Sequence, residues 1–133
     1  KGAFWGCSAL EEFVLPDAVN MLDQGVLANC TSLKSVSLHD GVLSIGYGAF
    51  YNCSAIESVT LPAAVVNVGD QAFRSCKSLR ELRVLCDAAP MCSADIADAD
   101  VYARTLLLVP QGKVGEYGFS RVWDRFGNIE EIV

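Results

Sequence analysis

IGYGAFYNCSAIESVTLP, residues 45–62, decides the fold because its pattern of apolar side chains recurs along the chain at one spacing. Cysteines 23 residues apart mark four copies of it: Cys7, Cys30, Cys53 and Cys76. Three apolar columns keep the same spacing: Phe4, Leu27, Phe50 and Phe73; Leu10, Leu33, Ile56 and Leu79; and Phe13, Val36, Val59 and Leu82. A fixed period of this length is the sequence signature of a repeat protein.

Each copy contains one short segment in which apolar and polar residues alternate, as they do in a half-buried β-strand. Val59-Thr60-Leu61 is such a segment, and Pro62 ends it because proline has no backbone N–H to donate to a ladder. A second apolar group, residues 65–69, is rich in β-branched residues and too short for an ordinary helix. We therefore expect each copy to form one coil of a solenoid, with parallel strands stacked on one wall and short strands or turns on the opposite wall.

The regular pattern stops after Leu85, and an irregular insertion follows. Residues 105–110 and 129–132 then restore the strand pattern, so we count six strands on one wall. Between them, residues 112–125 carry enough apolar side chains for one or two short helices that roof the last coil. These side chains, with the residue that follows the segment, are Val114, Tyr117, Phe119, Val122, Trp123 and Phe126.

At the other end, the chain starts in the middle of a repeat, since residues 1–4 align with residues 47–50. An uncovered coil would expose strand edges and apolar side chains, which natural proteins avoid. We expect this chain to be the C-terminal part of a longer protein, or its first coil to be covered by a second copy through self-association.

Composition and charge exclude some classes of partner. The chain is 52% hydrophobic and 20% charged over 133 residues, which is typical of one packed domain. A net charge of -6 argues against nucleic acid and anionic membranes as partners, because both need a basic face. The sequence has no run of about 18 apolar residues, so we expect no membrane insertion.

The four patterned cysteines could suggest zinc, which four thiolates bind tetrahedrally. Equivalent positions of a solenoid form a straight row at ~4.8 Å per rung, so the outer sulfurs cannot converge on one ion. The same spacing disfavours disulfides between neighbouring rungs. We expect free cysteines that fill the core. Cys86 and Cys92 lie outside the pattern, and a disulfide between them could clip the insertion if the protein is exported.

The sequence offers little for catalysis. The sole histidine, His39, stands where other copies have Pro16 and Pro62, so we expect a solvated turn residue. The carboxylates form no pair whose environments would separate their pKa values. Three acidic residues of the insertion, Asp95, Asp98 and Asp100, lack the glycine and the closing glutamate of a calcium loop. We expect no catalytic residue, no metal and no cofactor.

Candidate binding residues stand at the outward positions of the predicted strands. Two columns cross the sheet: Glu12, Ser35, Ser58 and Glu81; and Val14, Ser37, Thr60 and Arg83. They are mostly small and hydroxylic, which suits a flat protein or peptide partner, and no aromatic platform for sugar stacking accompanies them. A further column, Trp5, Ala28, Tyr51 and Arg74, follows the buried phenylalanine position and could point outward. Both sets could equally be ordinary solvated surface.

The copies Ile45-Gly46-x-x-Ala49-Phe50-x-x-Cys53-x-x-Ile56-x-x-Val59-x-Leu61-Pro62 and Val68-Gly69-x-x-Ala72-Phe73-x-x-Cys76-x-x-Leu79 resemble BspA-type leucine-rich repeats. The tail from Leu108-Val109-Pro110 to Ile132 resembles the closing segment of such proteins. The departures are His39 for proline, Asp23 for glycine, and Val26-Leu27 for Ala-Phe.

The resemblance implies an α/β-type leucine-rich repeat solenoid that is mainly β. It would have a parallel sheet of about six strands on one wall, short strands or turns on the other, and a small helical C-terminal cap. Residues 1–85 would be the repeats, the first of them incomplete, and residues 86–133 would be the insertion, the last strands and the cap of the same solenoid.

For function, the resemblance implies an extracellular or cell-surface protein of bacteria, a non-catalytic adhesion or interaction module that binds a protein on a host or bacterial surface. Two alternatives stay open: a purely structural C-terminal end-piece of a larger surface protein, and, more distantly, a hydrolase fragment that would depend on His39.

Overall fold

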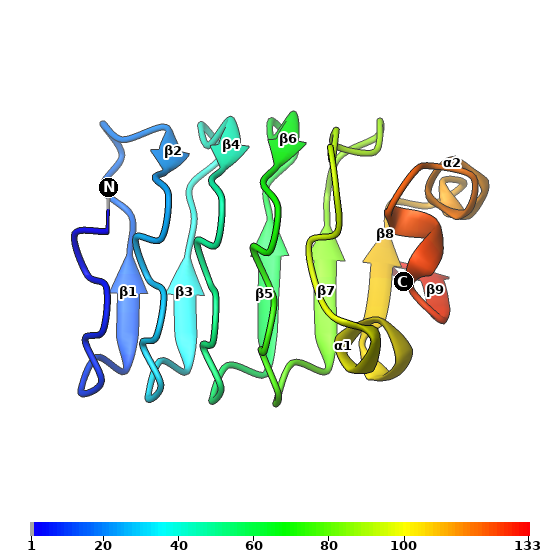
Figure 1. The fold of residues 1–133 in the computed structure, drawn as a ribbon. Coiled ribbons are helices and arrows are strands. Elements are labelled where there is room, and N and C mark those ends of the chain that lie inside the picture. Colours follow the sequence, from blue (N-terminus) through cyan, green and yellow to red (C-terminus); the bar gives the residue numbers. More distant parts are fainter. Residues whose placement is uncertain (1) are drawn as a thin grey trace.

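The chain winds into a stack of coils, of which the computed structural model describes residues 2–133. Within these residues, one wall of the stack carries six parallel strands in chain order (Figure 1), namely β1 (Glu12–Val14), β3 (Ser35–Ser37), β5 (Ser58–Leu61), β7 (Glu81–Val84), β8 (Leu106–Val109) and β9 (Asn128–Glu131). Paired strands of the repeats keep one register, as in Phe13↔Val36 and Val59↔Leu82. The predicted solenoid with stacked parallel strands is confirmed.

Hydrogen bonding divides this wall into two sheets, where we expected a single parallel sheet of about six strands. β1 pairs with β3, while β5, β7, β8 and β9 form a four-stranded sheet. Across the part of the chain that the structure describes, no ladder joins β3 to β5, and the gap between them is wider than its neighbours (Figure 1). Val36 and Leu38 are accordingly only half-buried, whereas their counterparts Val59 and Leu61 are buried.

The second wall holds the short strands β2 (Met21–Leu22), β4 (Ser44–Ile45) and β6 (Asn67–Val68) in one parallel sheet. The sheet is continuous across the boundary where β3 and β5 separate, so the coils fan apart on one side only. Glycine is required here because the coils approach closely. A Cβ on Gly46 would stand 2.6 Å from the carbonyl oxygen of Leu22, and one on Gly69 would stand 2.5 Å from the backbone nitrogen of Tyr47.

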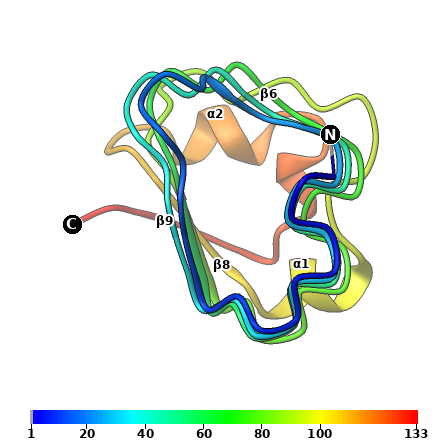
Figure 2. The ribbon, with the colours of Figure 1, turned by 90° about the vertical axis from the view of Figure 1, so that its left-hand side faces the viewer.

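A third wall, opposite the long strands, consists of tandem turns (Figure 2). We call residues 2–6, 24–29, 47–52 and 70–75 the turn wall. Alternate N–H groups of each turn donate to carbonyls of the next coil, as in Gly25 N to Tyr47 O (2.8 Å) and Leu27 N to Ala49 O (3.0 Å). Two columns adopt the left-handed backbone conformation, which glycine and asparagine tolerate best. Their members are Gly2, Gly25, Gly48 and Gln71, and Gly6, Asn29, Asn52 and Ser75.

The core runs along the axis of the stack. Leu27, Phe50 and Phe73 are fully buried in successive coils, and the rings of Phe50 and Phe73 stack with centroids 5.3 Å apart. The patterned cysteines are free, as predicted, and the last three of them are fully buried. Their thiols donate to carbonyls of the preceding coil at 3.1 Å, namely Cys30 to Phe4, Cys53 to Leu27 and Cys76 to Phe50.

The insertion is more regular than the sequence indicated. It continues the ladder of the turn wall, since Gln71 N donates to Asp95 O (2.8 Å) and Phe73 N to Ile96 O (2.7 Å). It also contains a helix that we did not predict, α1 (Ala99–Arg104), which leads into β8. The insertion is therefore a modified coil.

Short helices cover the C-terminal end of the stack, as predicted: α2 (Val114–Gly118) and the 3-10 helix η1 (Trp123–Arg125) (Figures 1 and 2). Trp123 and Tyr117 are fully buried, and their rings lie edge to face at 5.5 Å. Phe119 does not belong to this roof, because it is 92% exposed. The boundary that we placed between residues 85 and 86 stays a prediction.

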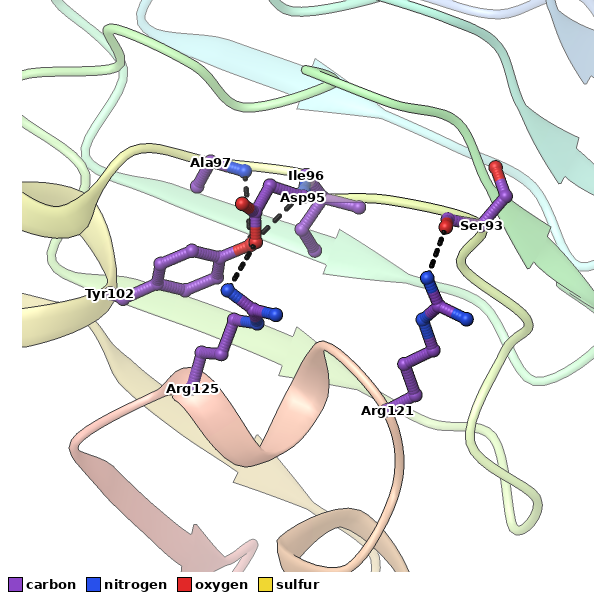
Figure 3. Close-up of polar contacts among 7 residues, drawn as sticks. All are labelled: Ser93, Asp95, Ile96, Ala97, Tyr102, Arg121 and Arg125. Atoms are coloured by element: carbon purple, nitrogen blue, oxygen red, sulfur yellow. Dashed lines mark hydrogen bonds and ion pairs between the residues drawn. The ribbon is translucent and has the colours of Figure 1, made fainter.

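Polar contacts bind this cap to the insertion (Figure 3). Arg125 lies 3.1 Å from the Asp95 carboxylate, and Arg121 donates to the Ser93 carbonyl at 3.0 Å. The Tyr102 hydroxyl donates to Asp95 and accepts from the backbone N–H of Ile96 and Ala97. The insertion and the cap thus close the end of the solenoid together.

Candidate interaction surfaces

The structure brings the outward positions of the long strands together in two columns, which we call the sheet face. Glu12 pairs with Ser35 and Ser58 with Glu81, and two residues further on Val14 pairs with Ser37 and Thr60 with Arg83. All are exposed except Glu81 and Arg83, which are partly buried. The division between β3 and β5 separates the columns into two pairs of strands. Between Ser37 and Thr60 the sheet face is therefore not a continuous hydrogen-bonded surface.

Charge lies at both ends of the repeat part of the sheet face: Glu12 stands on β1, and Glu81 and Arg83 stand on β7. Arg83 stands 3.8 Å from Glu81 on β7. The next strand places Leu106 and Leu108 at the positions that pair with Glu81 and Arg83; Leu106 is partly buried and Leu108 is buried. Leucine at both outward positions of a strand is not predicted from the alternation seen in the repeats. From β3 to β8 the sheet face thus passes from hydroxyl groups to an ion pair and then to a partly buried leucine.

The column of Trp5, Ala28, Tyr51 and Arg74 lies on the turn wall, not on the sheet face. Trp5 is 62% exposed and Arg74 is exposed, while Tyr51 is half-buried and Ala28 is buried. The small size of Ala28 leaves a hollow between the aromatic residues above and below it. A groove of about 560 Å³ results, lined by Gly2, Trp5, Gln24, Gly25, Ala28, Tyr47, Gly48, Tyr51 and Gln71.

The geometry of His39 does not favour a catalytic base. Its Nε2 donates to the carbonyl oxygen of Val19 at 2.7 Å, and its Nδ1 accepts from the backbone N–H of Gly41 at 3.1 Å. Both ring nitrogens therefore hold backbone groups of a turn and of the preceding coil. We expected His39 to be a solvated turn residue. Its side chain is half-exposed, and its hydrogen bonds join one coil to the preceding one.

Of the three acidic residues of the insertion, Asp95 has a structural role. Asp95 accepts from Tyr102 and pairs with Arg125, and Asp98 occupies the N-cap position of α1 without a side-chain capping bond. In residues 2–133, no group of three or more His, Cys, Asp or Glu side chains is placed to hold a metal ion.

Cys86 and Cys92 are both free, so the disulfide that the sequence left open is not formed in this structure. The buried Cys86 thiol lies 3.2 Å from the carbonyl oxygen of Pro62 and 3.3 Å from that of Val65, which ties it to the preceding coil. Cys92 donates to the carbonyl oxygen of Pro90 at 3.7 Å. Burial raises the pKa of the Cys86 thiol to about 11 and that of Cys92 to about 12. Both thiols are thus poor nucleophiles at neutral pH.

Stacked coils with one strand per repeat on the first wall, and an outward column at each alternate position of these strands, define a leucine-rich repeat solenoid. The model of the family described as BspA type leucine rich repeat region matches residues 1–88 in six copies. The chain belongs to this family, and the match indicates no enzymatic family. In residues 2–133, no helix has the length and apolar character needed to cross a membrane.

Two solved structures are similar to the chain. A leucine rich cell surface protein from Faecalibacterium prausnitzii has a TM-score of 0.63 and 18% identity, over 98% of this chain and 40% of that one. A leucine-rich repeat protein from Bacteroides ovatus has a TM-score of 0.68 and 23% identity, over 99% of this chain and 33% of that one. At these identities the similarity shows the fold alone, and the chain spans well under half of either protein. No curated protein matches the chain.

Proposed function

We propose that this chain is a non-catalytic module at a bacterial cell surface that binds a protein partner through its sheet face. The observation that supports this most is the exposure of small hydroxylic side chains at the outward positions of two strands: Ser35 and Ser37 on β3, and Ser58 and Thr60 on β5. Each of these strands is held in a ladder with a neighbouring strand, so a partner can bind there without ordering of the backbone. The similarity to a cell surface protein supports the location.

The arrangement beside these strands also fits recognition of a protein. The Glu81–Arg83 pair offers both signs of charge, and Leu106 beside it offers a partly exposed apolar side chain. An apolar and charged patch beside a polar array resembles the mixed composition of protein interfaces. In this proposal, Arg83 and Leu106 contribute most of the affinity, and the hydroxyl groups provide fit.

The test measures binding of fluorescently labelled protein to intact human epithelial cells and to intact bacteria by flow cytometry. Ser58→Arg and Arg83→Ala should reduce cell binding, because the first adds bulk to the sheet face and the second removes a predicted contact. Val66→Arg is the matched control, since Val66 is 62% exposed on the second wall. Trypsin treatment of the cells should abolish binding if the partner is a protein.

Equal binding by the wild-type protein and both sheet-face variants would contradict the proposal and favour the structural end-piece. Thermal melting by circular dichroism distinguishes this result from unfolding. All three positions are at least partly exposed, so the melting temperatures should agree within a few degrees.

A further inference from the structure

We propose that the groove on the turn wall binds a neutral oligosaccharide, independently of the sheet face. Two coils provide its aromatic side chains: Trp5 comes from the first coil, and Tyr47 and Tyr51 come from the third. The second coil lies between them and contributes only the small Gly25 and Ala28 with the amide of Gln24. Aromatic residues on both sides of a low floor can pack against the C–H faces of sugar rings.

Gly25 and Gly48 have no side chain, and this keeps the neighbouring aromatic residues accessible. A Cβ on Gly25 would stand 3.8 Å from Cδ1 of Trp5, and one on Gly48 would stand 3.6 Å from Cβ of Tyr51. Larger side chains at these two positions would extend from there over the rings. Trp5 and Tyr51 occupy one column and are two rungs apart, roughly 10 Å at ~4.8 Å per rung. That separation allows two rings of one oligosaccharide chain to contact them.

Charge and hydrogen bonding indicate the class of ligand. The nine residues of 2–133 that line the groove are uncharged, although the protein carries a net charge of -6. Asp70 and Arg74 occupy the columns of Tyr47 and Tyr51 one coil further on and are outside the lining, while Lys1 lies outside the described residues. The side chains of Gln24 and Gln71 form no hydrogen bond with any part of residues 2–133. Each amide can both donate and accept, which matches sugar hydroxyl groups.

The backbone of the groove is fixed before any ligand arrives. Gly2 N donates to Gln24 O at 2.9 Å, Gly25 N to Tyr47 O at 2.8 Å, and Gly48 N to Asp70 O at 2.9 Å. These bonds link every coil of the groove to the next. Little backbone entropy is therefore lost on binding, which favours a ligand whose individual contacts are weak.

The experiment titrates the protein with cellohexaose, maltohexaose, mannohexaose and xylohexaose by isothermal calorimetry and intrinsic fluorescence. Trp5 is exposed whereas Trp123 is fully buried in the cap, so a spectral change reports on the groove. At least one hexasaccharide should bind, and Trp5→Ala or Tyr51→Ala should weaken its binding by about tenfold or more. Phe119→Ala, which removes an aromatic ring 92% exposed on the cap, should leave the affinity unchanged.

A blocking variant tests the groove without removing a ring. Gly25→Gln places in the second coil the residue that Gln71 places in the same column at φ +60°, so the fold has a precedent for glutamine in this conformation. It should abolish saccharide binding; because the left-handed backbone at Gly25 (φ +62°) strains any side chain, its melting temperature should fall by several degrees while its far-UV circular dichroism stays that of the folded protein.

Three results would overturn the proposal. In the first, no hexasaccharide binds at about 10 mM. In the second, binding survives Trp5→Ala, Tyr51→Ala and Gly25→Gln. In the third, a proline-rich decapeptide binds the groove and the saccharides do not. Cell binding through the sheet face is unaffected by any of these results, so the two proposals fail separately.

Discussion

Gly46 shows how a single residue sets the distance between coils. Its backbone donates to the carbonyl oxygen of Leu22 at 2.7 Å, and a Cβ in the same place would stand 2.6 Å from that oxygen. The sequence reveals Gly46 and Gly69 as recurrent glycines, but the reason is visible only in the structure. The atoms that exclude a side chain belong to the backbone of the neighbouring coil and cannot move aside.

Gly46→Ala should therefore lower the free energy of unfolding by about 1–3 kcal/mol, because the coils must separate to admit the methyl group. Urea denaturation at neutral pH measures the change. Gly115→Ala is the matched control: it lies in α2 with nothing within 4 Å of its Cβ position, and alanine favours a helix there. Equal stability of the two variants would show that the coil spacing is not limited at Gly46.

At the scale of elements, the cap depends on one tryptophan. Trp123 is fully buried, its Nε1 donates to the carbonyl oxygen of Pro90 at 2.8 Å, and its ring packs against Tyr117 and Phe126. It joins the 3-10 helix η1 to the insertion, and Tyr117 does the same for α2 through a 2.6 Å bond to the carbonyl oxygen of Cys86. The short helices are thus held by tertiary contacts and not by their own propensity.

Trp123→Ala should cost about 3–5 kcal/mol of stability, since it removes a large buried side chain and leaves a cavity at the end of the core. Differential scanning calorimetry measures the loss, and light scattering should detect association through the opened coil. The exposed Phe119→Ala should change neither signal. A melting temperature for Trp123→Ala close to that of wild type would contradict the role given to the cap.

The sequence predicts an element when the repeat pattern of apolar residues marks it. Strand positions follow from alternation at Phe13, Val36, Val59 and Leu82, and the structure confirms all four. The separation of β3 from β5 has no such signal, because Val36 and Val59 are identical residues in the same alternation of apolar and polar residues. Helix α1 was missed because its six residues, Ala99–Arg104, are too few to show an apolar period.

The sheet face and the groove on the turn wall also differ in how far the sequence predicts them. The columns of the sheet face could be read directly, since each column is one residue position of the repeat. The groove on the turn wall could be read only in part: the column of Trp5, Ala28 and Tyr51 is visible in the sequence, but Tyr47 belongs to another column. Only the closeness of three coils brings them together, and the left-handed conformation at Gln71 is not predictable from glutamine itself.

At the scale of the molecule, buried cysteines and a buried tyrosine make the protein less stable at alkaline pH. Burial raises the pKa of Cys53 and of Cys92 to about 12, that of Cys86 to about 11 and that of Tyr102 to about 12. In the unfolded chain these groups lose their protons at lower pH than in the folded protein. The folded state therefore binds more protons above about pH 9, and stability must fall as pH rises.

Urea midpoints should accordingly be constant up to about pH 8.5 and decline between about pH 9 and pH 12. Cys53→Ser isolates one contribution, because serine does not titrate in this range and can still donate to the carbonyl oxygen of Leu27. Its midpoint should decline less steeply than that of wild type. Parallel curves for the two proteins would mean that the buried thiol of Cys53 does not titrate with unfolding.

The bonds of the turn wall make neighbouring coils interchangeable. Gly25, Leu27 and Asn29 donate to Tyr47, Ala49 and Tyr51 in the same way as Gly48, Phe50 and Asn52 donate to Asp70, Ala72 and Arg74. A genetic duplication of one 23-residue unit would give each flanking coil a partner equivalent to the one it lost. Such a gene could lengthen or shorten by whole units through recombination, and the length of surface offered to a ligand would change in the same steps.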